Sequence, residues 1–321
     1  MKKSINKFVT IGEPMAMFTA NETGDLALTE TFTKRLAGAE LNVAIGMARL
    51  GFHSTYITKL GLDSFGRYIE RAVRAEGIDT TLFTYSSENA TGFQLKSREL
   101  KGNDPTVEYF RKNSAASTLH ADEYPESIFS DDIHLHLTGV AAAVSPSLRA
   151  LCHKALDVAK ANGNSVSFDT NLRPALWCST QQMIEEINAL AFKSDIVLPG
   201  IAEGKILTGS DVPEEIADFY LHQGVQMVVV KLGGDGAYYK LANGEFGVKP
   251  GQKVESVVDT VGAGDSFAVG VVSAWLENIQ ASEAVARGNL FGALAVQVLG
   301  DSEGLPTRSK LDAIKAECNK T

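Results

Sequence analysis

Short apolar segments rich in β-branched residues alternate along this chain with segments of helical periodicity. The predicted strands cover residues 7–12, 55–59, 133–138, 165–169, 196–198 and 226–231. The predicted helices cover residues 39–50, 63–76, 146–162, 265–276, 282–299 and 311–317. Strands that alternate with helices indicate parallel β-α-β units and an open sheet covered on both faces. The sequence therefore predicts an α/β fold of three layers, α/β/α, around a mostly parallel sheet.

Two insertions, at about 13–35 and 85–118, break this alternation. Both contain strand-like alternation and turn residues but no helical pattern. We expect them to form a small β-sheet lid over the carboxyl ends of the parallel strands, where open α/β sheets bind ligands. Decoration of the sheet edge is the alternative. Residues 1–321 are expected to form a single domain that carries this lid.

The charge and the cysteines of the chain exclude several classes of protein. Its 321 residues carry a formal net charge of −9, which disfavours nucleic acid and anionic membranes as partners. No segment approaches the roughly 18 consecutive apolar residues of a transmembrane helix. The cysteines, at 152, 178 and 318, are odd in number and far apart, which is typical of reduced thiols. The sequence therefore predicts a cytoplasmic protein.

The strongest local motif is Asp-Thr-Val-Gly-Ala-Gly-Asp at 259–265, directly before an apolar helical segment. The backbone N–H groups of Gly262, Ala263 and Gly264 are expected at a helix N-terminus, where the helix dipole favours anions. Asp265 follows at the mouth of this anion site. It is expected to be either the N-cap of the helix, a role that aspartate fills well, or a catalytic base.

The 259–265 motif resembles the C-terminal signature of PfkB-type carbohydrate kinases, the ribokinase-like family. Residues 37–44, Ala-Gly-Ala-Glu-Leu-Asn-Val-Ala, resemble the N-terminal glycine-rich signature of the same family. The two segments stand in the order that the family requires. The resemblance implies a ribokinase-like fold and phosphoryl transfer from ATP with Mg²⁺. It also implies that Asp265 is the catalytic base and that Gly262, Ala263 and Gly264 form the anion hole.

The nucleotide site is expected around a second glycine-rich segment. Gly233-Gly234-Asp235-Gly236 follows a predicted strand, which on local chemistry predicts a hairpin turn. By the resemblance, Lys231, Gly233, Gly236 and Asn289 contact ATP. A P-loop and a dinucleotide-binding glycine fingerprint after the first strand are both missing, which disfavours the competing nucleotide-binding folds.

Two further segments bear on the substrate. Residues 109–116 and 168–177 resemble the subfamily that phosphorylates 2-keto-3-deoxygluconate, and Met17 stands where sugar kinases for ribose or fructose usually carry an aspartate. Loss of that carboxylate favours an acidic substrate. Alternatives are a solvated charge for Arg111, a helix start for Arg173 and lid packing for Tyr109. The resemblance implies substrate contacts from Gly38, Asn42, Tyr109, Arg111, Arg173 and Asp301.

Cation binding is expected at two places. The family places an Asn-x-x-Glu element after a mid-sheet strand to serve Mg²⁺, and here Gly200 replaces the asparagine while Glu203 is kept. Glu203 is therefore expected to act on Mg²⁺ through water. A monovalent cation such as K⁺ is left open near Asp259 and the turn at 300–303.

The predicted reaction transfers the γ-phosphate of MgATP to the primary hydroxyl of 2-keto-3-deoxygluconate. A kinase for fructose or another neutral keto sugar is the first alternative. A non-catalytic nucleotide or sugar sensor on the same fold is the alternative from a different class. A homodimer or higher homo-oligomer through the lid is expected.

Overall fold

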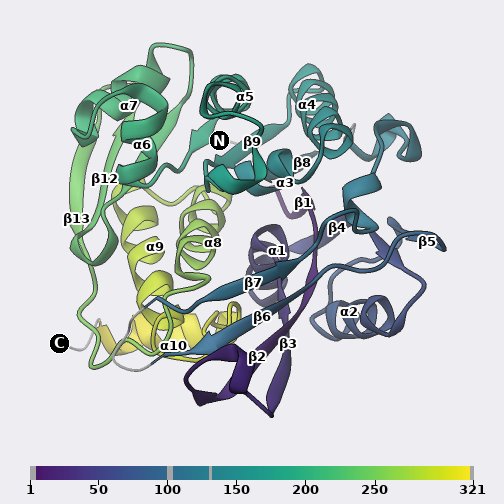
Figure 1. The fold of residues 1–321 in the computed structure, drawn as a ribbon. Coiled ribbons are helices and arrows are strands. Elements are labelled where there is room, and N and C mark those ends of the chain that lie inside the picture. The colour runs from purple at the N-terminus through teal and green to yellow at the C-terminus, as the bar shows by residue number, and fades with distance from the viewer. Residues whose placement is uncertain (1–4, 100–103, 130–131, 319–321) are drawn as a thin grey trace.

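The computed structural model describes residues 5–99, 104–129 and 132–318. Its main feature is a nine-stranded sheet with helices packed around it, as the ribbon in Figure 1 shows. The strand order is β13-β12-β11-β10-β9-β8-β1-β4-β5, parallel from β11 to β5 and antiparallel at β12 and β13. The strands are β1 (Lys7–Ile11), β4 (His53–Gly61), β5 (Phe83–Ser86), β8 (Ile133–Thr138), β9 (Ser165–Asp169), β10 (Ile196–Val197), β11 (Met227–Lys231), β12 (Gly236–Leu241) and β13 (Phe246–Pro250).

Helices cover both faces of this sheet. One face packs against α3 (Gly139–Val144), α4 (Pro146–Ala161), α5 (Thr180–Phe192), α6 (Ile201–Thr208) and α7 (Pro213–Leu221). The other packs against α1 (Ala39–Arg49), α2 (Ser64–Ala75), α8 (Ala263–Leu276), α9 (Ala281–Ala295) and α10 (Arg308–Cys318). The three-layer fold with a mostly parallel sheet is thus confirmed.

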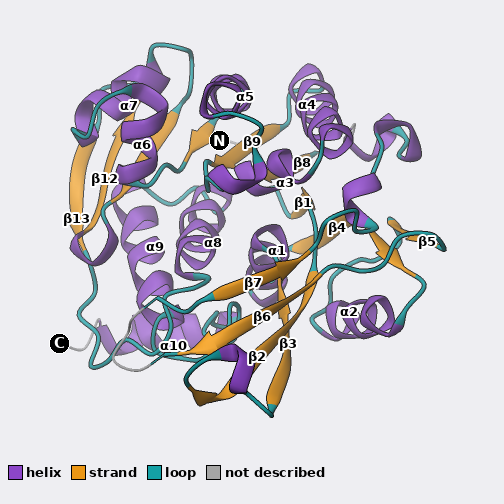
Figure 2. Cartoon of the chain, viewed as in Figure 1, coloured by secondary structure: helices purple, strands orange, loops and turns teal. Residues whose placement is uncertain are grey.

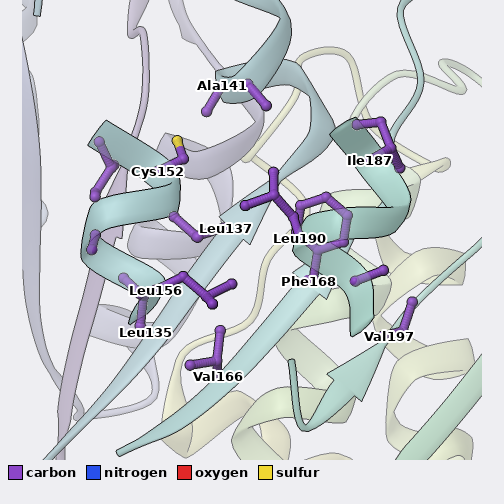
Figure 3. Close-up of a cluster of buried hydrophobic side chains, with 14 of the residues drawn as sticks. Leu135, Leu137, Ala141, Cys152, Leu156, Val166, Phe168, Ile187, Leu190 and Val197 are labelled. Atoms are coloured by element: carbon purple, nitrogen blue, oxygen red, sulfur yellow. The ribbon is translucent and has the colours of Figure 1, made fainter. Parts of the chain in front are cut away.

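Side-chain alternation along the strands divides the core into two clusters. In β11, Val228 and Val230 join one cluster, while Met227 and Val229 join the other. A strand with both faces buried needs apolar residues at every position, which explains the continuous apolar run. Figure 3 shows part of the first cluster, where side chains from β8 and β9 meet those of α4 and α5.

The lid is a separate sheet of four strands in the order β3-β2-β6-β7. In Figure 2 its strands lie at the lower centre of the view. Tyr85, at the start of the second expected insertion, lies instead in β5 of the large sheet, where Phe83 is buried against Tyr56. The strands are β2 (Met15–Thr23), β3 (Phe32–Ala37), β6 (Phe93–Arg98) and β7 (Val107–Phe110).

Two other differences from the predicted elements have tertiary causes. The helix predicted over 282–299 ends at Ala295, because the carbonyl of Val296 accepts hydrogen bonds from the backbone of Val258 and Asp259. The β12–β13 hairpin lacked a strong sequence pattern, since β13 alternates between half-exposed and exposed residues at the sheet edge. No helix among the described residues is long and apolar enough to cross a membrane.

Candidate active site

The turn before α8 forms one wall of the site. Gly262 is the N-cap of α8 with φ of +79°, and a Cβ there would lie 2.2 Å from the carbonyl oxygen of Asp301. Only glycine tolerates both conditions. Asp265 follows in the first turn of the helix, so the alternative that it is the N-cap is wrong, and its side chain lines the cavity described below.

The Asp265 carboxylate is buried and is held by two amides. Asn42 in α1 donates to Oδ2 at 2.8 Å, and Asn171 after β9 donates to Oδ1 at 3.2 Å. Burial raises the pKa of Asp265 to about 7, with Asp169 adding to the rise and Arg173 opposing it. A carboxylate with a pKa near neutrality is well matched to general-base chemistry.

A cavity of about 360 Å³ opens over Asp265, between the lid and the carboxyl ends of the parallel strands. It brings together segments from the whole chain, as the sequence motifs predicted. The sequence-predicted residues that line it are Gly38, Asn42, Tyr109, Arg111, Arg173, Glu203, Lys231, Gly262, Gly264, Asp265 and Asp301.

Arg111, directly after β7, is fixed by a carboxylate that sequence analysis missed. Its Nε atom donates to Oε2 of Glu13 at 2.7 Å, and the Glu13 side chain has no exposed surface. Ser114 donates to the other oxygen of Glu13. The alternative that Arg111 is a solvated charge is wrong, because only 10% of its side chain is exposed.

Arg173 and Tyr109 approach the cavity from different elements. Arg173 precedes a short 3₁₀ turn at Pro174–Leu176, which fits the helix-start alternative, and its side chain also lines the cavity. Tyr109 lies on the lid strand β7 and is 49% exposed. Gly38 begins α1 with φ of +136°, and a Cβ there would lie 2.8 Å from the carbonyl oxygen of Glu13.

Met17, which stands where kinases for ribose or fructose usually carry an aspartate, brings no charge to the cavity. Its side chain is buried in the lid with Met15 and Ala37 and does not line the cavity. The carboxylate that does line the cavity from this part of the chain is Glu13, which Arg111 neutralises. The Glu13–Arg111 ion pair is therefore the charged pair that these two lid-flanking segments bring to the cavity.

A second cavity, of about 370 Å³, lies beyond the Gly-rich turn and is mainly apolar. Gly233, Gly236, Ala263 and Asn289 line it. The 233–236 segment is the hairpin between β11 and β12, as its local chemistry predicted. The Asn289 amide donates to two backbone carbonyls at the end of β13, at 3.0 Å each, and so anchors that strand to the cavity wall.

Lys231 stands where the two cavities meet. It lines both of them, together with Thr260 and Gly264. Its Nζ atom lies 2.8 and 2.9 Å from the two oxygens of Asp169, and although burial opposes it, this carboxylate keeps the pKa of Lys231 above its ordinary value. A positive charge is thus fixed between the two cavities.

Glu203 is a candidate for metal binding. Its carboxylate accepts from Thr170 and from the backbone of Gly200 and Leu172, at 2.7 to 2.8 Å. Although burial opposes it, Lys231 and these bonds lower the pKa of Glu203, so the group is ionised. A Cβ on Gly200 would lie 3.2 Å from this carboxylate, so glycine leaves it room. Within the described residues no cluster of three or more His, Cys, Asp or Glu could hold a metal.

Asp301 lines the cavity, but its carboxylate is engaged by a lysine that no sequence motif indicated. Lys96 on the lid strand β6 lies 3.0 Å from Asp301 and 2.7 Å from Asp259. Burial raises the pKa of Asp301, while Lys96 opposes the rise. The structure therefore places Asp301 in an ion-pair network at the cavity edge.

A β-lid over an α/β sheet, an anion-binding turn, a buried aspartate in one cavity and a lysine shared with a second cavity define a class of nucleotide-dependent phosphotransferases. Residues 5–308 match the pfkB family of carbohydrate kinases, and the chain belongs to that family.

Relatives across the family support the assignment. The chain is 49% identical over 304 residues to a 2-dehydro-3-deoxygluconokinase of Bacillus subtilis, covering 94% of this chain and 93% of the relative. A PfkB protein of Polaromonas sp. JS666 has a TM-score of 0.88 at 45% identity, covering 96% and 99% of the two chains. A putative ribokinase II of E. coli, solved with ATP and Mg²⁺, has a TM-score of 0.88 at 28% identity, covering 98% and 100%.

Proposed function

We propose that this protein is an ATP-dependent kinase that phosphorylates the primary hydroxyl of 2-keto-3-deoxygluconate, also called 2-dehydro-3-deoxygluconate. The observation that carries the proposal is the content of the central cavity. One buried aspartate with a pKa near 7 shares it with two arginines and with the amides of an anion-binding turn. A base beside an anion site suits transfer to a hydroxyl, and the arginines suit an acceptor that carries a carboxylate.

The acceptor is held by groups from the lid and the sheet. Arg111 and Arg173 both line the cavity, and a guanidinium binds a carboxylate through paired hydrogen bonds. Tyr109, Gly38 and Asn42 line the same space and supply contacts for the rest of the sugar chain. Asp301 contributes at the rim, where its carboxylate is shared with Lys96.

Proton transfer falls to Asp265. In its ionised form the carboxylate accepts the proton of the primary hydroxyl as that oxygen attacks the γ-phosphate in line. The amides of Gly262, Ala263 and Gly264 stabilise charge on the phosphoryl oxygens at the N-terminus of α8. Asn42 and Asn171 orient the carboxylate through their hydrogen bonds.

The donor occupies the second cavity. Gly233, Gly236 and Asn289 border the space for the nucleotide, and Lys231 holds its charge where the phosphates cross toward the acceptor. Mg²⁺ neutralises phosphate charge when bound, and the ionised Glu203 carboxylate fits an ion that keeps several of its waters. The proposal includes a cytoplasmic location, because ATP is available there.

Relatives favour the acid sugar over a neutral one. The Bacillus subtilis relative carries that specificity in its name and shares about half of its residues with this chain. The second acceptor class, fructose and other neutral keto sugars, carries no carboxylate for the cavity residue Arg173 to bind. A homodimer or higher oligomer through the lid stays a prediction; Tyr109 and Phe110 on the lid strand β7 are about half exposed.

A direct test measures ADP release with MgATP and either 2-keto-3-deoxygluconate or fructose. We expect a strong preference for the acid sugar and a product phosphorylated on its primary hydroxyl, identified by ³¹P NMR. An Arg173→Met variant tests the contact with the carboxylate of the acid sugar. It should raise KM for the acid sugar while leaving KM for ATP nearly unchanged. A clear preference for fructose would overturn the acid-sugar assignment, and nucleotide binding without turnover on any sugar would indicate a sensor.

A further inference from the structure

Lys96 is a lid residue whose side chain is buried in the body of the protein. It belongs to strand β6, yet only 1% of its side chain is exposed. Its Nζ atom lies 2.7 Å from Oδ2 of Asp259 and 3.0 Å from Oδ1 of Asp301. Removing an ammonium from water is costly unless carboxylates and hydrogen bonds compensate it. The two aspartates provide that compensation, so the lysine and the acids depend on one another.

Both aspartates are tied to the anion-binding turn. Oδ1 of Asp259 accepts from the backbone of Val261 at 3.1 Å, and Oδ2 accepts from the backbone of Gly300 at 3.2 Å. The carbonyl of Asp301 packs directly against Gly262, with no room for a Cβ between them. The positions of the two aspartates therefore determine where the Gly262–Gly264 amides point.

The lid reaches this region at two further places. Thr260 of the turn donates to Asp104 at 2.6 Å, and Asp104 lies just before β7. Arg35 of β3 forms an ion pair with Glu303 at 2.8 Å. Lys96 differs from these contacts in its burial, because Arg35 and Glu303 keep 27% and 34% of their side chains exposed. The Lys96 contact is therefore the one least screened by solvent.

Two buried carboxylates that converge on one point require a cation. The sequence left a monovalent ion such as K⁺ open near Asp259 and residues 300–303, and an ammonium occupies the space between the two carboxylates. A lysine ammonium is a compact, singly charged group, comparable to a monovalent ion in charge. Unlike a free ion, it is covalently attached to the lid.

We propose that Lys96 is a built-in cation that positions the 259–264 turn for phosphoryl transfer, so that the enzyme needs no added monovalent cation. Lys96 is a positioning residue: it touches neither cavity and acts through Asp259 and Asp301. The inference rests on the proposed kinase function, because it concerns the turn that stabilises the transferred phosphoryl group. It also links lid placement to the turn, since withdrawal of β6 would leave two buried acids unpaired.

The first experiment uses the wild-type enzyme. Turnover of 2-keto-3-deoxygluconate is measured while KCl is replaced by tetramethylammonium chloride at constant ionic strength. We expect kcat to be unchanged. If turnover requires K⁺, the proposal is overturned, because a free ion would then have the positioning role proposed for Lys96. This arm does not depend on the folding of any variant.

The second experiment replaces the ammonium. Lys96→Ala should lower kcat by roughly 10–100-fold, as is typical for a supporting residue behind a site, with smaller changes in both KM values. Added K⁺ or NH₄⁺ should restore part of kcat, whereas tetramethylammonium is too large to enter. The matched control is Lys34→Ala, which removes an exposed lid lysine that lies over Tyr68 and should change neither kcat nor its response to salt.

A readout independent of activity separates this inference from the proposed function. The Tm of Lys96→Ala should rise with K⁺ or NH₄⁺ relative to tetramethylammonium, while the Tm of the wild type and of Lys34→Ala should not respond differentially. Absence of turnover in the wild type would refute the kinase function and leave this thermal test valid. An unchanged kcat in Lys96→Ala, or a Tm with no cation response, would overturn the inference.

Discussion

Glu13 and Arg111 form a buried ion pair beneath the acceptor cavity, with Nε of Arg111 2.7 Å from Oε2 of Glu13. The two residues belong to different parts of the chain, one shortly before β2 and one directly after β7. Their charges cancel locally, so Arg111 can be buried without a bound anion. The pair also fixes the guanidinium at the cavity wall before the substrate arrives, which lowers the entropic cost of binding.

Removing one partner of this ion pair should destabilise the protein more than removing both. Arg111→Met leaves the Glu13 carboxylate buried without its cation, which should lower the free energy of unfolding by about 3–5 kcal/mol. The double variant Glu13→Gln/Arg111→Met should recover much of that loss, because no buried charge is left unpaired. Urea denaturation of the wild type, both single variants and the double variant measures the coupling. Strictly additive losses would show that the pair is not energetically coupled.

Removal of the Asp265 charge should abolish chemistry without abolishing nucleotide binding. Asp265→Asn should lower kcat by roughly 10²–10⁴-fold, the usual contribution of a positioned base. ATP affinity, measured by isothermal titration calorimetry, should stay close to that of the wild type, because the nucleotide cavity is bordered by other residues. Near-normal turnover in this variant would remove Asp265 from the role of base.

The pH profile should report the same group. The base must be ionised, and burial raises the pKa of Asp265 to about 7, so kcat/KM should rise with pH and level off above that value. Arg173 lowers this pKa through its positive charge, so in Arg173→Met the limb should move to higher pH. Initial rates across a series of buffers at constant ionic strength measure both. A profile flat from pH 5 to 8 would be inconsistent with the raised pKa.

The free energy of unfolding should change with pH in the opposite direction to kcat/KM. The folded protein holds a proton on Asp265 up to about pH 7, whereas the unfolded chain releases it near the ordinary aspartate value of 3.8. The folded state therefore binds more protons between these values, and this group makes the free energy of unfolding fall as pH rises through that window. Asp265→Asn should remove this slope and raise Tm above pH 7. An Asn variant less stable than the wild type there would contradict the assignment.

Gly262 should tolerate no side chain. Gly262→Ala combines a left-handed backbone, which costs roughly 1–2 kcal/mol for an L-residue, with a clash against Asp301. Gly209→Ala is the matched control, since Gly209 has φ of +85° but no atom within 4 Å of the position that an alanine Cβ would take. Thermal unfolding should show a larger loss for Gly262→Ala, and only that variant should lose turnover. Equal losses in both would show that the contact with Asp301 is not restrictive.

Sequence patterns predicted what is encoded locally. Gly262, Gly264 and Asp265 are nearly contiguous, so one motif carried the anion-binding turn and the buried carboxylate together. The continuous apolar run of β11 predicted this strand to within one residue, because a strand buried on both faces is apolar at every position. The cavity residues on 109–111 and at 173 were recognisable because each stands within a longer family-like segment.

Contacts between residues far apart in the sequence have no local sequence pattern that predicts them. Lys96 lies in an ordinary strand, and nothing around it predicts that its ammonium contacts an aspartate 163 residues further along the chain. Glu13 was overlooked for the same reason, since its partner lies 98 residues away. Tyr85 was assigned to the lid because a short edge strand and a lid strand have the same alternation, and only pairing with β4 distinguishes them.

The lid sheet has a consequence for how the chain folds. Its central pair, β2 and β6, is parallel, and the residues between these strands include α1, β4, α2 and β5. Pairing two strands across so long a connection costs loop-closure entropy before the contacts that compensate this cost have formed. The lid should therefore assemble only after the first β-α-β unit has folded beneath it. The lid, which covers the acceptor cavity, is then also the last part of the protein to form, because its sheet depends on the α/β body for its assembly.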